Sequence, residues 1–116
     1  MESGGKCPGL DIDRGIEQFG GNEELYFSIL QYYLSDARTL LESMQNAGED
    51  GLEDYARTAH SIKGASRNVF ANDIGDAAEK LEHAAKDGDT AYIAEHNKEF
   101  LNDAWKLVHD IEGLIA

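Results

Sequence analysis

The sequence has one cysteine and one proline among its 116 residues, Cys7 and Pro8. A single cysteine cannot form a disulfide within the chain, and the absence of proline after residue 8 permits long uninterrupted helices. No apolar run approaches the roughly 20 residues that a membrane helix needs. The first residues, MESGGKCPG, lack the apolar segment of a signal peptide. These absences favour a cytoplasmic protein without a membrane anchor.

Basic residues are also scarce. The chain has 10 lysines and arginines against 23 aspartates and glutamates, which gives a formal net charge of -13. Nucleic acids and anionic membranes attract basic surfaces, so this balance argues against both as partners. The excess of acid is compatible with a merely solvated surface, or with a partner that presents a basic face.

Apolar residues recur at steps of three and four along four stretches, a spacing typical of amphipathic helices. The stretches cover about residues 22–44, 52–70, 72–86 and 90–111, and a short helix is expected from Asp11 or Asp13 to about Phe19. No stretch alternates in the manner of a strand. The sequence therefore predicts an all-α fold, an antiparallel up-down four-helix bundle with an additional short N-terminal helix. Residues 1–10 are expected to form a flexible lead-in, and residues 11–116 the bundle domain.

The stretch around His60 holds the residues with the clearest chemical potential. On a helical wheel, His60 falls at the border of the apolar stripe, and Lys63, Gly64 and Arg67 follow on the same side. Glycine inside a helix costs about 0.8–1 kcal/mol relative to alanine, but its missing side chain would let another molecule approach the imidazole. No acidic residue occurs from residue 55 to 72, which predicts a local basic zone. An isolated histidine beside an apolar stripe is more often structural, whereas this combination favours a phosphoryl-binding site.

Residues 60–66, with the sequence HSIKGAS, resemble the motif of histidine-containing phosphotransfer (HPt) domains, which is H-x-x-K-G followed by two small residues. The segment GGNEEL at residues 20–25 also resembles the start of the second helix in many members, and the similarity extends from about residue 10 to the C-terminus. The resemblance implies a four-helix bundle whose second long helix carries an exposed phosphoacceptor, His60. Lys63 and Gly64 match the flanking positions of the motif.

The family pattern implies two further residues. Some HPt domains place a glutamine 22 residues after the histidine, where it hydrogen-bonds the imidazole, and a basic residue four positions later; Glu82 and Lys86 stand at these positions. The resemblance thus implies that Glu82 fixes the imidazole tautomer and that Lys86 screens phosphate charge. The chain departs from the family at Phe70, where many members have glycine, and at Arg67, where they often have a small residue. We expect Phe70 to extend the apolar stripe, and Arg67 to pair with the phosphate or with an acidic partner surface.

The residues and the resemblance together predict a phosphorelay intermediate. It would accept a phosphoryl group on His60 from a phospho-aspartyl receiver domain and pass it to the receiver of a response regulator. The implied partners are such receivers and a sensor or hybrid histidine kinase, with the chain itself acting as a monomer. The resemblance assigns the catalytic aspartate and Mg²⁺ to the receiver, so no cofactor is expected in this chain. The sequence lacks a nucleotide-binding loop of the form G-x-x-x-x-G-K, and it is therefore not expected to be an enzyme with ATP-dependent kinase activity.

Two alternatives remain open. The first is a helical docking or scaffold module without phosphate chemistry, which would take up no acid-labile phosphate from phosphorylated receivers. The second is a metal site built on histidines, but His83, His96 and His109 lack close pairing such as i and i+4. These three histidines are expected to be surface or packing residues.

Overall fold

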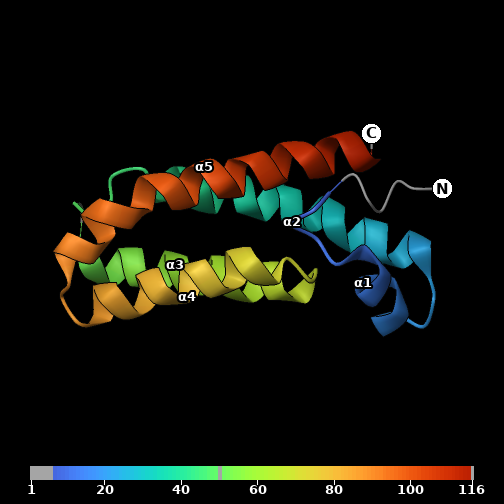
Figure 1. Ribbon diagram of the computed structural model, residues 1–116, viewed down its shortest axis with the longest axis horizontal. Helices are drawn as coiled ribbons and strands as arrows, with labels where there is room; N and C mark the ends of the chain where they lie inside the picture. The colour runs from blue at the N-terminus through green and yellow to red at the C-terminus, as the bar shows by residue number, and fades with distance from the viewer. Residues whose placement is uncertain (1–6, 50, 116) are drawn as a thin grey trace.

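The computed structural model describes residues 7–49 and 51–115, and within these residues it contains five helices and no strand. The helices are α1 (Ile12–Gln18), α2 (Glu23–Ser43), α3 (Leu52–Asn68), α4 (Asn72–Lys86) and α5 (Thr90–Ile115). The four long helices run up and down beside one another in an elongated bundle, with the short α1 at one end (Figure 1). The predicted all-α bundle with a short additional N-terminal helix is therefore confirmed. Within the described ranges, no helix is long and apolar enough to cross a membrane.

Each long helix turns one apolar face toward the centre of the bundle. Helix α3 packs against α2 and α4, and α5 packs against the same two helices. On α3 the buried positions recur at helical spacing, at Tyr55, Ala56, Ala59, Ile62 and Ser66. His60 follows Ala59 and is thus rotated by about 100° from the centre of this stripe. The packing of α3 therefore sets the histidine at the surface of the bundle.

Side-chain caps define where the first two helices begin. The side chain of Asp11 accepts a hydrogen bond from the N–H of Arg14 at 3.3 Å, and the side chain of Asn22 accepts one from the N–H of Leu25 at 3.0 Å. The first amides of a helix have no partner inside the helix, and these side chains supply one. Of the two aspartates expected to start the short helix, Asp11 is the cap.

Helix α3 ends at Asn68, two residues before the predicted end at Phe70. The N–H of Ala71 donates to the carbonyl of Ser66 at 2.8 Å, and the N–H of Phe70 donates to the carbonyl of Arg67 at 3.1 Å. These two bonds form a Schellman motif, which requires a left-handed residue, and Phe70 adopts that conformation with φ of 67°. Phe70 is half-buried and lies outside the apolar core. The expectation that Phe70 extends the apolar stripe is therefore wrong.

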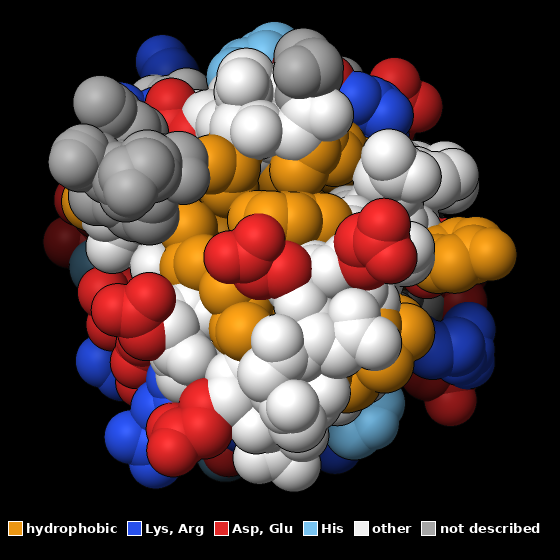
Figure 2. Space-filling model, turned by 90° about the vertical axis from the view of Figure 1, so that its right-hand side faces the viewer, with side chains coloured by type: hydrophobic (Ala, Val, Ile, Leu, Met, Phe, Trp, Pro, Cys, Tyr) orange, Lys and Arg blue, Asp and Glu red, His pale blue; other side chains and the backbone are white. Residues whose placement is uncertain are grey.

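The segment before α1 crosses one end of the bundle. Cys7 and Leu10 are buried, and the N–H of Asp11 donates to the carbonyl of Phe70 at 3.0 Å. Residues 7–10 thus differ from the flexible lead-in expected over residues 1–10, because buried side chains fix them to the core. Residues 1–6 of that prediction lie outside the described residues. Seen from the end that carries α1, hydrophobic side chains reach the surface between acidic ones (Figure 2).

Candidate functional site

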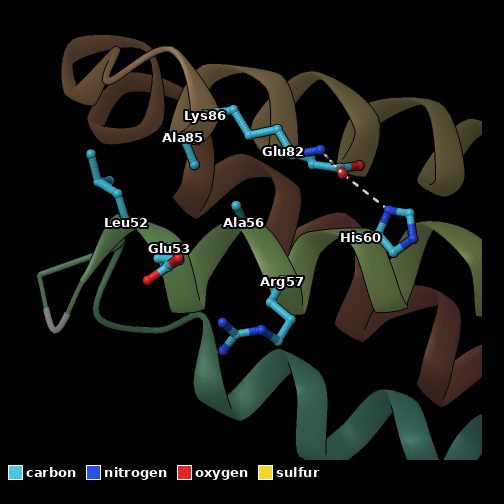
Figure 3. Close-up of a pocket in the computed structure, with 8 residues that line it drawn as sticks. All are labelled: Leu52, Glu53, Ala56, Arg57, His60, Glu82, Ala85 and Lys86. Carbon is cyan, nitrogen blue, oxygen red and sulfur yellow. Dashed lines mark hydrogen bonds and ion pairs between the residues drawn. The ribbon is translucent and has the colours of Figure 1, made fainter.

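His60 projects from the middle of α3 toward solvent, and its side chain is 64% exposed. Ala59 and Ile62 on the same helix are fully buried, so their packing fixes the direction in which the imidazole leaves the helix. The ring stands on the side of α3 that faces α4, at one end of a groove between the two helices (Figure 3). A histidine in this position can react with a group carried by another protein.

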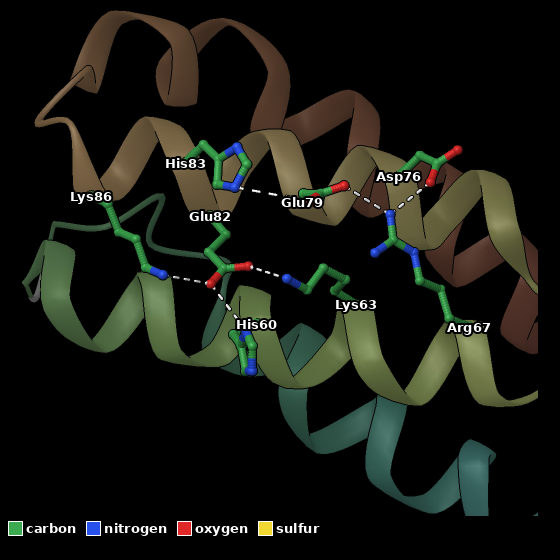
Figure 4. A network of polar contacts seen from close by, with 8 residues as sticks. All are labelled: His60, Lys63, Arg67, Asp76, Glu79, Glu82, His83 and Lys86. Carbon is green, nitrogen blue, oxygen red and sulfur yellow. Dashed lines mark hydrogen bonds and ion pairs between the residues drawn. The ribbon is translucent and has the colours of Figure 1, made fainter.

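A single carboxylate on α4, that of Glu82, lies at the centre of the contacts around His60. Its side chain is only 2% exposed, and its Oε2 lies 3.0 Å from Nδ1 of His60. The ammonium groups of two lysines contact its oxygens, Lys63 at Oε1 and Lys86 at Oε2, each at 2.9 Å (Figure 4). The contact between Glu82 and the imidazole that the resemblance implied is thus present in the structure.

The protonation state of Glu82 follows from these neighbours. Burial raises the pKa of its carboxyl, but hydrogen bonds from Lys63, Lys86 and His60 outweigh burial and lower the pKa to about 2. Glu82 is therefore ionised near neutral pH and can only accept hydrogen bonds. The Nδ1 atom of a neutral His60 must then carry the ring proton, because Nδ1 is the atom that contacts the carboxylate. This tautomer leaves the lone pair of Nε2 free for reaction.

Gly64 lies on the exposed side of α3, one turn after His60. A Cβ atom built at this position would meet no heavy atom within 4 Å outside its own helix turn. Close packing within the chain therefore does not require glycine here. The open space is consistent with the interpretation that Gly64 leaves room for another molecule beside the imidazole.

Arg67 bridges α3 to α4. Its guanidinium binds the carboxylates of Asp76 and Glu79 at 2.7 and 2.8 Å (Figure 4), and its hydrogen bond lowers the pKa of Glu79. This pairing differs from the expected contact of Arg67 with a phosphate or a partner, since two carboxylates of the chain itself already occupy the guanidinium.

The expected basic zone around His60 is not basic in the structure, because acidic side chains of α4 face it. Residues 55–72 contain no acid, but the carboxylates of Asp76, Glu79 and Glu82 lie against them from α4. Sequence reasoning missed Asp76 and Glu79. The available signal was that Asp76, Glu79 and Glu82 follow one another at steps of three residues, which places them along one side of a helix.

The groove that adjoins His60 has an apolar floor and a rim with charges of both signs. Leu52, Ala56 and Ala85 supply the apolar atoms, and the charged side chains that line it are Glu53, Arg57, Glu82 and Lys86 (Figure 3). Sequence analysis did not identify this groove, because it forms only where particular faces of α3 and α4 meet. The small side chains of Ala56 and Ala85 were the only trace of it in the sequence.

The other three histidines take part in local surface contacts. His83 lies 4.0 Å from Glu79, and His109 lies 3.3 Å from Glu112. The ring of His96 lies against that of Tyr92, with centroids 4.2 Å apart. Among the described residues, no group of three or more histidine, cysteine or acidic side chains is arranged to hold a metal ion.

Comparison with protein families adds an independent finding to this geometry. Residues 28–114 match the family model described as the Hpt domain. The matched range contains all of α3 and α4, and with them His60, Glu82 and both lysines. A search of curated proteins and a search of solved structures each gave no match. Because the family match spans most of its length, the chain belongs to the Hpt domain family.

Proposed function

We propose that this chain is a phosphorelay intermediate in which Nε2 of His60 accepts a phosphoryl group from the aspartate of a receiver domain and passes it to the receiver of a response regulator. Hpt domains act in phosphorelay histidine phosphotransfer, with two-component proteins such as receiver domains and kinases as partners. The observation that carries the proposal is the exposed imidazole whose Nδ1 contacts the buried carboxylate of Glu82. This contact supports Nε2 as the reacting atom.

The proposed transfer is a displacement at phosphorus. The lone pair of Nε2 forms the N–P bond while the bond between phosphorus and the aspartyl oxygen breaks, and the electron pair leaves with the aspartate carboxylate. The ring becomes positively charged because Nδ1 keeps its proton, and the carboxylate of Glu82, 3.0 Å from Nδ1, stabilises that charge. Transfer to the next receiver reverses these steps. Under this proposal the receiver supplies Mg²⁺ and the acidic groups that bind it.

On its own, the chain should not phosphorylate itself from ATP. Hpt domains are phosphotransfer intermediates and not kinases, and the sequence has no G-x-x-x-x-G-K loop for a nucleotide. We therefore propose that a sensor or hybrid histidine kinase starts the relay and that this chain has no ATP-dependent kinase activity. We further propose that it works as a monomer in the cytoplasm.

Label transfer tests the proposal. The purified chain is mixed with a panel of radiolabelled phospho-receiver domains, and the acid-labile phosphate that appears on the chain is followed over time. We expect transfer from at least one receiver and complete loss of transfer in His60→Gln. The His60 side chain is 64% exposed, so this substitution should cost the fold no more than its one hydrogen bond to Glu82, about 0.5–1.5 kcal/mol.

His83→Gln is the matched control, since the side chain of His83 is 63% exposed and lies on the neighbouring helix α4. This variant should accept phosphate at the wild-type rate. Acid-labile phosphate on the His60→Gln chain would assign the acceptor to a different residue. A wild-type chain that takes up phosphate from no receiver would favour the docking or scaffold alternative.

A further inference from the structure

Helices α4 and α5 meet along a second groove, which has a volume of about 320 Å³. All the residues that line this α4–α5 groove belong to those two helices, and neither His60 nor Glu82 is among them. Ala77, which lines the groove, precedes Glu82 by five residues and therefore lies about 140° away from it around α4. The α4–α5 groove and the His60 site thus occupy different sides of the same helix.

The floor of the α4–α5 groove is apolar and partly aromatic. Leu81 and Phe100 are buried there, and the half-buried side chains of Ala77 and Tyr92 also line it. Lysine and arginine side chains can lay their methylene stems along such a surface while their charged ends stay in water. The face of an aromatic ring such as that of Tyr92 also attracts a cation.

The charges around the α4–α5 groove are mainly acidic. The charged residues that line it are one lysine, Lys80, and four acids, Asp73, Asp76, Glu99 and Asp103. Arg67 binds Asp76, whereas the other three carboxylates are exposed and form no ion pair in the described part of the chain. The groove beside His60 differs, because its two acids are balanced by two basic residues. The α4–α5 groove therefore carries negative charge that the chain itself does not neutralise.

We propose that the α4–α5 groove is a docking site for a segment of a partner protein that is rich in arginine or lysine. The stems of the basic side chains lie on the apolar floor, and their charged ends pair with Asp73, Glu99 and Asp103. Because His60 lies outside the groove, the partner can stay attached while His60 reacts. Attachment at this second site raises the effective concentration at which the rest of the partner meets His60.

Other occupants fit the groove less well. A second copy of the chain would bring a further net charge of -13 to a surface that is already acidic. Nucleic acids and anionic membranes would be repelled for the same reason. Within residues 7–49 and 51–115, no group of histidine, cysteine or acidic side chains is arranged to hold a metal ion. A basic protein segment complements both the charge and the apolar floor.

The docking site can be tested with a blocked peptide of about ten residues that alternates arginine with leucine. We expect the peptide to shift the ¹H–¹⁵N amide signals of residues that line the α4–α5 groove more than those of α2. The combined variant Asp73→Asn, Glu99→Gln and Asp103→Asn should weaken binding about tenfold, because it removes three exposed ion pairs. Asp73 also lies in the first turn of α4, where its charge favours the helix. The double variant without Asp73→Asn should therefore still weaken binding about fourfold.

A matched variant separates the groove from the net charge of the chain. Glu17→Gln, Asp36→Asn and Glu42→Gln also remove three exposed carboxylates, but none of them lines the groove. This control should bind the peptide within about twofold of the wild-type chain, since distant exposed charges are screened by salt. Equal weakening in both combined variants, or a peptide that shifts no amide signal, would overturn the proposal. Self-association that the groove variant abolishes, measured by sedimentation, would assign the groove to a second copy instead.

The separation from His60 is tested with phosphoramidate, a small phosphoryl donor that needs no receiver. Saturating peptide should leave the rate at which phosphoramidate phosphorylates His60 unchanged, and His60→Gln should bind the peptide as tightly as the wild-type chain. Slower phosphorylation in the presence of the peptide would contradict a docking site apart from His60. Peptide binding requires no phosphorylated receiver, so a chain that exchanges phosphate with no receiver would contradict the proposed function alone.

Discussion

Glu82 is an ionised carboxylate buried between two helices, where the ammonium groups of Lys63 and Lys86 form ion pairs with it and Nδ1 of His60 donates to it. Its pKa of about 2 in the folded chain lies below the ordinary value of 4.5. The unfolded state therefore binds the proton of this group more tightly than the folded state does. It follows that Glu82 contributes stability that is fully present above about pH 4.5 and is lost as the pH falls toward 2.

Glu82→Gln should for this reason flatten the acid side of the stability profile. Between about pH 6 and pH 2 the wild-type chain should lose on the order of 3 kcal/mol more free energy of unfolding than the variant, because glutamine takes up no proton. Urea unfolding at a series of pH values, followed by circular dichroism, measures the difference. Glu53→Gln, at an exposed position of α3, should keep the wild-type profile. A wild-type slope in Glu82→Gln would show that the cations do not hold this carboxylate in its ionised form.

Gly64 allows stability and transfer to be separated at one position. Its helical backbone and the empty space around it mean that Gly64→Ala and Gly64→Gln should each stabilise the fold by up to about 1 kcal/mol. Transfer from a phospho-receiver should nevertheless fall, and fall more for glutamine, because a side chain here obstructs the approach to the imidazole. Urea unfolding and label transfer on the same preparations measure the two effects.

Gly113 provides the control for this experiment. It is an exposed glycine of α5, and a Cβ atom there would also meet nothing within 4 Å. Gly113→Ala should therefore leave the transfer rate unchanged. A Gly64→Gln chain that exchanges phosphate at the wild-type rate would remove the steric explanation for this glycine.

The helices themselves could be predicted from the sequence, since spacing and caps define them locally. The four apolar stretches became α2 to α5, and Asp11 caps α1. The end of α3 could not be placed in this way. An apolar residue at position 70 fits a continuing stripe, but the Schellman bonds at Ser66 and Arg67 turn the backbone left-handed there. Whether α3 ends before residue 70 depends on where α4 must begin in the bundle, and the spacing of apolar residues carries no information about that.

The corner between α3 and α4 carries a prediction of its own. A left-handed conformation costs a residue with a Cβ atom about 1 kcal/mol or more, and glycine adopts it freely. Phe70 has φ of 67° and lies outside the apolar core, so Phe70→Gly should raise the free energy of unfolding by about 0.5–1 kcal/mol. Asn68→Gly, at the last helical residue of α3, should instead lower it by a similar amount. Destabilisation by Phe70→Gly would mean that the packing of the half-buried ring outweighs the backbone strain.

At the scale of the whole molecule, the sequence predicts charges along each helix but not which helix faces they meet. The acid-free window at residues 55–72 suggested a basic surface around His60, yet α4 brings the carboxylates of Asp76, Glu79 and Glu82 onto it. Only the contact of Glu82 with the imidazole was anticipated, and it came from the family resemblance. The spatial order of helices is a property of the assembled core, so Arg67 could not be assigned to its two carboxylates from the sequence.

The region before the family match is also part of the assembled core. The match begins at residue 28, whereas Cys7, Leu10, Ile12 and Tyr26 are all buried. The hydroxyl of Tyr26 donates to the carbonyl of Val69 at 2.8 Å, at the corner that ends the helix of His60. The N-terminal segment therefore helps to fix the corner between α3 and α4.

A chain trimmed to the matched residues 28–114 should for this reason be much less stable than the full chain. Burial of one large apolar side chain contributes about 1.5–3 kcal/mol, and trimming removes several, so we expect the fragment to lose cooperative unfolding or to unfold at far lower urea. Leu10→Ala in the full chain should lower the free energy of unfolding by about 2–5 kcal/mol. Arg14→Ala, at an exposed position of α1, should lower it by less than about 0.5 kcal/mol. Circular dichroism and ¹H–¹⁵N spectra measure the folding of the fragment and of these two variants. A fragment with the wild-type unfolding midpoint would show that the N-terminal segment is dispensable. The corner at Phe70 would then have to be held by the four long helices alone.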